Sequence, residues 1–147
     1  MLMLRKIFNE RLYLLIASIY IIALSSLSIL KHYNLYTFAY DLGIFMQSLY
    51  TTLNGGFFYE TPDLYWNKTG NFLSVHFSIL AFILLPIYYL LPYAETLLIL
   101  QSLLLGSSGI ILYKITLNVT GDKSLSNILL ISYLSSAALH GANLYDF

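Results

Sequence analysis

The run LYLLIASIYIIALSSLSIL, residues 12–30, decides the class of this protein because it carries no charged side chain. At about 1.5 Å per residue, a helix of this length spans roughly 28 Å, which matches the hydrocarbon thickness of a bilayer. Arg11 precedes the run and Lys31 follows it immediately. The sequence therefore predicts a transmembrane helix at 12–30.

The basic residues before this helix predict its orientation. Arg5, Lys6 and Arg11 place the N-terminus in the cytoplasm of a cell membrane by the positive-inside rule. A cleaved signal peptide is the alternative, with Ala23-Leu24-Ser25 as a small-x-small cleavage site. Signal peptides usually contain about 7 to 15 apolar residues, so the longer run favours a retained helix.

The whole chain has the composition of a membrane protein. Of its 147 residues, 59% are hydrophobic and 10% are charged, and the mean hydropathy is +0.74. A soluble domain usually carries about 25% charged residues. Because this chain carries far fewer, we expect the lipid bilayer to surround it. The formal net charge is zero, which excludes a strongly basic surface for nucleic acid. The absence of cysteine excludes disulfides, thiolate metal sites and cysteine nucleophiles.

Three further hydrophobic blocks predict an all-α, polytopic bundle of three or four transmembrane helices in a single membrane domain. These blocks cover residues 72–91, 96–116 and 125–144. Gly106 and Gly109 are spaced for close contact between helices. Residues 31–71 are polar enough to leave the membrane, and we expect them to form an external loop.

An amphipathic helix is predicted inside this loop. Its apolar face would hold six residues at helical spacing, namely Leu42, Phe45, Met46, Leu49, Tyr50 and Leu53. Gly55-Gly56 should end the helix, because glycine readily adopts the left-handed conformation of a helix C-terminus. Such a helix would lie on the membrane surface or against the bundle.

The number of spans depends on the block 72–91. If all four blocks cross, residues 118–124 lie outside, although Lys123 is among them and Lys114 comes just before them. The connection after residue 91 has no basic residue, so the positive-inside rule favours three spans with 118–124 in the cytoplasm. Block 72–91 would then enter and leave on one side, with Pro86 as the expected break, and would need shielding from lipid.

The candidate functional residues are acidic side chains and one histidine. Asp41 precedes a helical run, so it can be an N-cap, and it can also be a carboxylate that faces a cavity as general base or metal ligand; the two roles are compatible. His76 begins an apolar block, where an interfacial role with one hydrogen-bond partner is more common than a ligand role. Glu60 and Asp63 are interpreted as solvated loop charges, and spacing alone gives Asp146 no special role.

Several motifs after the first helix resemble one family of prokaryotic membrane proteins. The run YDLGIFMQSLY, residues 40–50, is similar to its aromatic-Asp-Leu-Gly-aliphatic-Phe-x-Gln motif, and His76-Phe77-Ser78 to its His-Phe-Ser motif. Residues 91–102 and 141–147 are similar to the turn, helix start and aromatic-Asp-Phe motif that follow. On these motifs the chain resembles the domain of unknown function 2079 family. It departs from the family pattern at Ile79, where proline is usual, and in having no histidine after its final Asp-Phe.

This family resembles the GT-C membrane glycosyltransferases, which take a sugar from a polyprenyl-phosphate carrier. By that resemblance Asp41 is the base or metal ligand of the loop after the first helix, and Asp146 is a second catalytic acid on the outer side. A divalent cation, Mg²⁺ or Mn²⁺, would then be bound by Asp41 and Asp146, with His76 as a further ligand. The resemblance also implies the N-terminal part of a larger enzyme, which would need further helices from a longer chain or a partner subunit for activity. The alternative is a non-enzymatic membrane scaffold or transporter component.

Overall fold

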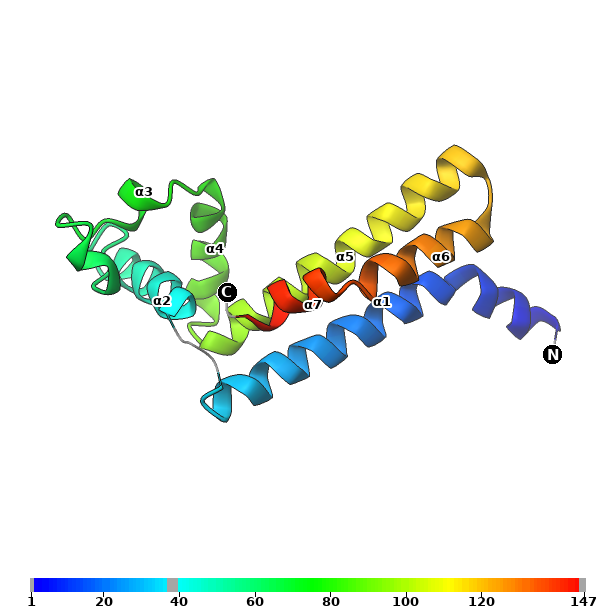
Figure 1. The fold of residues 1–147 in the computed structure, drawn as a ribbon, viewed down its shortest axis with the longest axis horizontal. Coiled ribbons are helices and arrows are strands. Elements are labelled where there is room, and N and C mark those ends of the chain that lie inside the picture. The colour runs from blue at the N-terminus through cyan, green and yellow to red at the C-terminus, as the bar shows by residue number, and fades with distance from the viewer. Residues whose placement is uncertain (1, 37–39, 146–147) are drawn as a thin grey trace.

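The computed structural model describes residues 2–36 and 40–145, with side chains from residue 11 onward, and this part of the chain is all-α as predicted (Figure 1). Its α-helices are α1 (Leu2–Tyr33), α2 (Tyr40–Leu53), α3 (Phe72–Val75), α4 (Ile79–Leu90), α5 (Ala94–Thr120), α6 (Lys123–Leu134) and α7 (Ala137–Leu144). A short 3-10 helix, η1 (Pro62–Tyr65), lies in the loop between α2 and α3.

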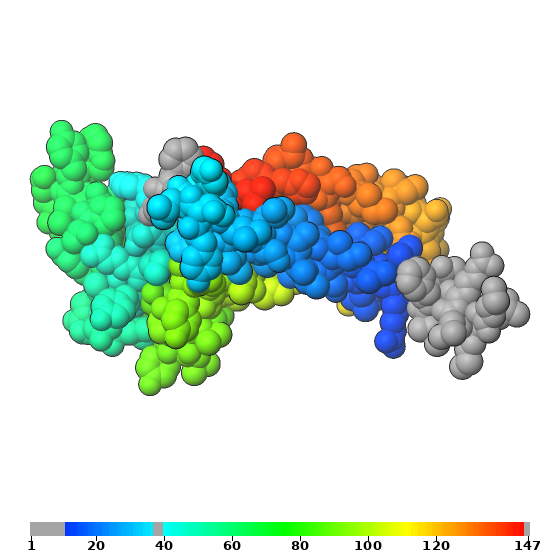
Figure 2. All heavy atoms as spheres, turned by 90° about the horizontal axis from the view of Figure 1, so that it is seen from below, coloured from blue at the N-terminus to red at the C-terminus, as the bar shows by residue number. Residues whose placement is uncertain are grey.

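Helices α1, α5 and the α6–α7 pair form an elongated three-helix bundle, and Figure 2 shows α1 running along it. Helices α1 and α5 are antiparallel. The rings of Tyr13 and Tyr113 stack at one end with centroids 4.3 Å apart, and the Tyr33 hydroxyl donates a hydrogen bond to Glu95 at the other. The buried core between the helices consists of Tyr20, Leu24, Tyr113, Leu130 and Leu134.

Gly106 and Gly109 make the close helix contacts that their spacing predicted. A Cβ atom on Gly106 would lie 2.3 Å from Cγ1 of Ile21 in α1. A Cβ atom on Gly109 would lie 2.9 Å from Cδ1 of Leu130 in α6. Helix α5 therefore packs against both of its neighbours through glycine, and a Cβ atom at either position would force a neighbouring side chain or helix to shift.

The lengths of the apolar helices agree with three spans rather than four. Among the described residues, α1 over Arg11–Tyr33 and α5 are each long and apolar enough to cross a membrane, and the α6–α7 pair passes as one span bent by 47°. Helix α4 is apolar but has 12 residues, or about 18 Å, which is too short for about 30 Å of hydrocarbon. Block 72–91 thus contains no helix long enough to span, which agrees with the three-span interpretation.

Two of the three later hydrophobic blocks are broken. Block 72–91 breaks between α3 and α4, and Pro86, the expected break, lies inside α4, which continues to Leu90. Block 125–144, predicted as one helix, bends between α6 and α7. The Nε2 atom of His140 lies 2.6 Å from the carbonyl oxygen of Leu134 at this bend. A carbonyl released from a helix within a membrane needs such a partner, and His140 supplies it.

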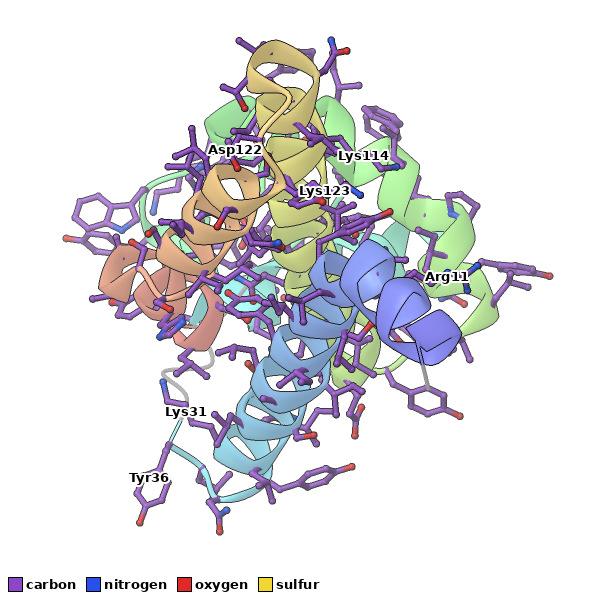
Figure 3. The ribbon with its side chains drawn as sticks, turned by 90° about the vertical axis from the view of Figure 1, so that its right-hand side faces the viewer. Arg11, Lys31, Tyr36, Lys114, Asp122 and Lys123 are labelled. Atoms are coloured by element: carbon purple, nitrogen blue, oxygen red, sulfur yellow. The ribbon has the colours of Figure 1, made fainter. Side chains whose placement is uncertain are left out.

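Three of the basic residues lie at the end of the bundle where α5 turns into α6, which faces the viewer in Figure 3. Because α1 and α5 are antiparallel, this end carries Arg11 together with Lys114 and Lys123. Gly121 closes α5 in the left-handed conformation, and Asp122 caps α6. Residues 118–124 therefore lie at the same end as Arg11, as three spans require.

Helices α2 to α4 gather at the opposite end around a second core, formed by Leu42, Ile44, Leu49, Phe58, Phe72, Ala81, Leu84, Tyr88, Ala94, Leu97 and Leu98. The predicted loop helix is present as α2, but its buried face differs from the prediction. Tyr50 and Leu53 are exposed, whereas Ile44 and Ser48 are buried. The reason is that α2 packs against α4, η1 and α5 at once, which covers a different set of its side chains from the apolar stripe in the sequence.

Candidate functional site

The loop between α2 and α3 buries two carboxylates. Glu60 has an exposed fraction of 0% and Asp63 of 5%, and the backbone N–H of Asp63 donates to Oε2 of Glu60 at 2.9 Å. The interpretation of both as solvated loop charges is therefore wrong. It fails because the loop folds back on itself: the N–H of Glu60 donates to the carbonyl of Gly70, and that of Phe72 to the carbonyl of Phe58.

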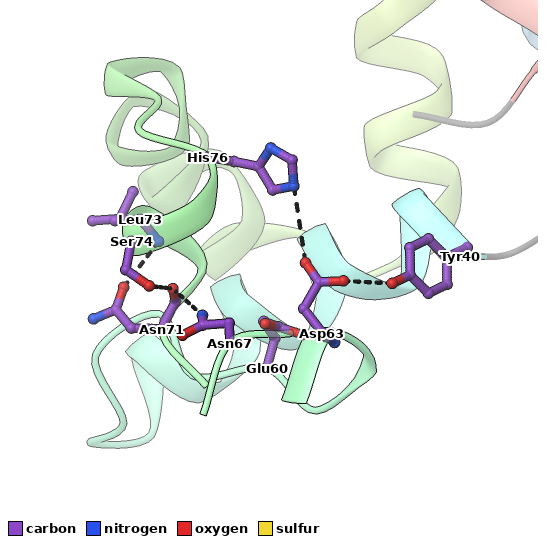
Figure 4. A network of polar contacts seen from close by, with 8 residues as sticks. All are labelled: Tyr40, Glu60, Asp63, Asn67, Asn71, Leu73, Ser74 and His76. Atoms are coloured by element: carbon purple, nitrogen blue, oxygen red, sulfur yellow. Dashed lines mark hydrogen bonds and ion pairs between the residues drawn. The ribbon is translucent and has the colours of Figure 1, made fainter. Parts of the chain in front are cut away.

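Asp63 connects the start of α2 to the break between α3 and α4 (Figure 4). Its Oδ1 accepts a hydrogen bond from the Tyr40 hydroxyl, and its Oδ2 lies 3.8 Å from Nε2 of His76. The hydrogen bond to Asp63 raises the pKa of Tyr40 above its ordinary value of 10.0, with smaller effects from burial and nearby carboxylates. Tyr40 thus stays protonated as a donor, and one carboxylate holds side chains from two elements.

Asp41 and His76 line one cavity of about 340 Å³ beside this network. Asp41 lies in the first turn of α2, not before it as the N-cap alternative expected, and the helix dipole favours a carboxylate there. His76 follows α3 and has 57% of its side chain exposed. The other lining residues are Ile44, Phe45, Phe72, Phe77 and Ser78. Two of the three predicted site residues therefore share one cavity.

An apolar groove of about 210 Å³ adjoins this cavity and shares Phe45 and Ser78 with it. The remaining lining residues come from one face of α4 and from α5: Leu80, Ile83, Leu84, Ile87, Leu100 and Leu104. Polar and apolar surfaces are thus continuous here. The combination suits a ligand with a polar head and an apolar tail.

Asp146, the other predicted catalytic and metal-binding carboxylate, lies outside the described residues. The described end of α7 is anchored at the end of the bundle where α2 to α4 lie. The Asn143 side chain is fully buried, and its Nδ2 donates to Oγ of Ser102 at 2.9 Å. Lys31 at the end of α1 donates to the carbonyl of Leu144. Helix α7 therefore ends on the same side as α2 to α4.

The described residues do not form a metal site on their own. Among them, no group of three or more histidine or acidic side chains is arranged to hold an ion. The cavity wall offers one carboxylate, Asp41, and one imidazole, His76. Mg²⁺ is usually bound by one or two carboxylates together with phosphate oxygens and water, so these two side chains fall short of a complete site. The metal role of Asp41, Asp146 and His76 stays a prediction.

Sequence reasoning missed the buried carboxylates and their partner Tyr40. The available signal was Glu60-Thr61-Pro62-Asp63, in which proline opens the short helix η1. The loop is tied to α2 by Gln47, whose Oε1 accepts hydrogen bonds from the N–H and the hydroxyl of Thr61, both at 3.0 Å. The pattern shows a turn but not its burial, because acidic residues are mostly exposed in proteins.

The profile of one protein family, described as predicted membrane protein (DUF2079), matches residues 31–147. This range includes Asp41 and His76 on the cavity and Asp63 behind it. No curated protein and no solved structure matches the sequence.

Proposed function

This chain belongs to the DUF2079 family of predicted membrane proteins, and we propose that it forms the substrate-facing part of a GT-C-like glycosyltransferase. The proposed donor is a sugar carried on polyprenyl phosphate, and the proposed product is a sugar joined to an acceptor hydroxyl. With the N-terminus in the cytoplasm, the cavity would open on the outer side of the cell membrane.

The observation that supports this proposal is a cavity with three polar side chains on its wall, joined to an apolar groove. The cavity presents a carboxylate, an imidazole and a hydroxyl, from Asp41, His76 and Ser78, which suit a sugar phosphate. The groove between α4 and α5 suits an isoprenoid chain, since burying apolar surface contributes about 25 cal/mol per Å². A lipid-linked sugar has both parts in one molecule.

The start of α4 also favours a phosphate at the junction of cavity and groove. Ser78 precedes α4, lines both hollows, and makes no side-chain capping bond to the helix. The first N–H groups of a helix have no partner within it and carry a partial positive charge. A phosphate oxygen placed beside Ser78 would meet these groups.

Asp41 is the proposed general base. Its carboxylate takes the proton of the acceptor hydroxyl while that oxygen bonds to the anomeric carbon of the sugar. The bond from this carbon to the phosphate oxygen breaks, and its electron pair leaves with polyprenyl phosphate. General base catalysis of this kind contributes about 10²- to 10⁴-fold to the rate.

We expect activity to require further helices, from a longer chain or a partner subunit. Ile79, Leu80 and Phe82 of α4 are exposed, and these apolar side chains need lipid or protein around them. The alternative function, a non-enzymatic scaffold or transporter component, would use the same surfaces without turnover. A test of Asp41 separates the two.

The test compares Asp41→Asn with Asp122→Asn in the full-length protein. Both changes remove one charge, and asparagine caps α6 about as well as Asp122 does. Membranes are given polyprenyl-phosphate-linked hexoses, and release of free polyprenyl phosphate is measured at equal protein amounts. Asp41→Asn should lower release by about 100-fold or more, while Asp122→Asn leaves it unchanged. Wild-type release from Asp41→Asn would refute the role of Asp41, and no release from the wild type with any hexose would favour the scaffold.

A further inference from the structure

Asp63 holds a histidine at the cavity without reaching the cavity itself. It is buried, it is not among the residues that line the cavity, and its two carboxylate oxygens are directed to Tyr40 and His76. Its backbone is fixed in turn by the Glu60 carboxylate. His76 therefore lines the cavity and also contacts the Asp63 carboxylate, which Figure 4 shows beside its ring.

His76 is also the one described residue on the cavity wall that can carry a positive charge. The facing carboxylate of Asp41 would repel an anionic ligand, so a favourable contact has to come from the imidazole. Two groups flank the ring: the Asp63 carboxylate, 3.8 Å from Nε2, and the ring of Phe72, with centroids 5.5 Å apart. With Nε2 directed to Asp63, Nδ1 is the nitrogen left to face a ligand, and in the imidazolium form both ring nitrogens carry N–H groups, so that Nδ1 can donate to a phosphate oxygen.

We propose that His76 binds the phosphate group of the lipid-linked substrate through Nδ1, and that Asp63 is the positioning residue that fixes the imidazole for this contact. Tyr40 and Glu60 hold Asp63 in place from either side. The ligand, a polyprenyl phosphate, is that of the proposed function, on which this assignment rests. The apolar groove binds the polyprenyl chain, and His76 makes the protein prefer a lipid that ends in phosphate over one that ends in a hydroxyl.

The experiment measures the preference of the purified full chain for polyprenyl phosphate over polyprenol, by native mass spectrometry in detergent. The ratio of the two dissociation constants isolates the phosphate contact, because both lipids have the same tail. His76→Gln should lower this preference about tenfold or more, since hydrogen bonds to charged groups are the strong ones. Asp63→Asn should lower it in the same direction by about threefold or more, although His76 is still present.

Two matched variants serve as controls. Asp122→Asn makes the same change as Asp63→Asn at the opposite end of the bundle, and His32→Gln makes the same change as His76→Gln at the end of α1. Both should keep the wild-type preference. His76 is exposed, so its replacement should leave the fold intact.

Each remaining outcome decides one part of the proposal. An unchanged preference in His76→Gln would overturn the phosphate contact. Equal weakening of both lipids in Asp63→Asn would make Asp63 a residue of the fold alone and overturn its positioning role. Inorganic phosphate that competes as strongly as polyprenyl phosphate would overturn the lipid-linked source.

Failure here is distinguishable from failure of the proposed function. If His76→Gln loses the phosphate preference but no sugar is transferred, the binding assignment stands and the enzyme assignment fails. If sugar transfer depends on Asp41 but the preference for polyprenyl phosphate over polyprenol does not depend on His76, the proposed enzyme function stands and the proposed phosphate contact of His76 fails.

Discussion

Replacing Gly106 by alanine tests the close contact between α1 and α5. The added Cβ atom would lie 2.3 Å from Cγ1 and 2.8 Å from Cδ1 of Ile21. Isoleucine in a helix has one strongly preferred χ1 rotamer, so Ile21 cannot turn aside without strain. Overpacking of this kind costs about 1–3 kcal/mol, because the two helices must separate or an off-rotamer side chain must be tolerated.

Gly141→Ala is the matched control for this variant. Gly141 lies in α7, and its added Cβ would meet nothing within 4 Å. Alanine is favoured over glycine inside a helix by about 0.5–1 kcal/mol, so this variant should be slightly more stable than wild type. The same gain applies at Gly106 and cancels in the comparison. The two variants should therefore differ by about 1–3 kcal/mol, with Gly106→Ala the less stable.

Equilibrium unfolding in mixed detergent micelles, followed by helical circular dichroism, measures this difference. The two proteins are unfolded with increasing mole fractions of SDS under the same conditions, and their free energies of unfolding are compared. A Gly106→Ala variant as stable as Gly141→Ala would refute the reasoning. It would mean that α1 and α5 do not pack through Gly106.

Three further predictions follow from the topology, the bent span and the loop network. A cysteine at Asn54 should react with a membrane-impermeant thiol reagent in intact cells, and a cysteine at Ser124 should react only after lysis. The opposite pattern would reverse the orientation of the protein in the membrane. Labelling of both in intact cells would establish an even number of spans between them. His140→Ala should destabilise the protein by about 1–3 kcal/mol in the same unfolding assay, because it leaves the carbonyl at the α6–α7 bend without a partner, and no loss would show that the bend is satisfied otherwise. Because the folded-state pKa of Tyr40 is raised, its hydrogen bond to Asp63 contributes stability fully below pH 10.0 and loses it as pH rises through the folded-state pKa. The stability difference between wild type and Tyr40→Phe should thus be constant below that pH and shrink above it, and a difference that persists at higher pH would exclude the hydrogen bond as its cause.

Asp41 and His76 were identifiable as candidates from their positions at the edges of apolar blocks and from the family motifs. Their meeting in one cavity was a hypothesis that required the loop to fold back on α2. The contacts that do this, such as Gln47 to Thr61 and Asp63 to His76, join residues far apart in the chain. Each depends on side-chain geometry, which periodicity does not encode.

The all-α class, the apolar segments and the three-span interpretation were accessible from residue order alone. A bilayer imposes a length and a hydropathy on every spanning helix, and these are local properties of about 20 consecutive residues. The lysines that flank these segments indicate on which side of the membrane each loop lies. The loop helix α2 was predictable for the same reason, since helical spacing is local.

Burial of the polar residues was decided by packing between elements. Glu60 and Asp63 look like ordinary loop charges in the chain, yet they are enclosed because η1 and the turn at Gly70 close over them against α2. The break in block 125–144 likewise depends on His140 reaching a carbonyl six residues earlier. Hydropathy gives the average preference of a segment for lipid or water. The hydrogen-bond partner of a buried carboxylate or a freed carbonyl exists only once the helices and loops are assembled.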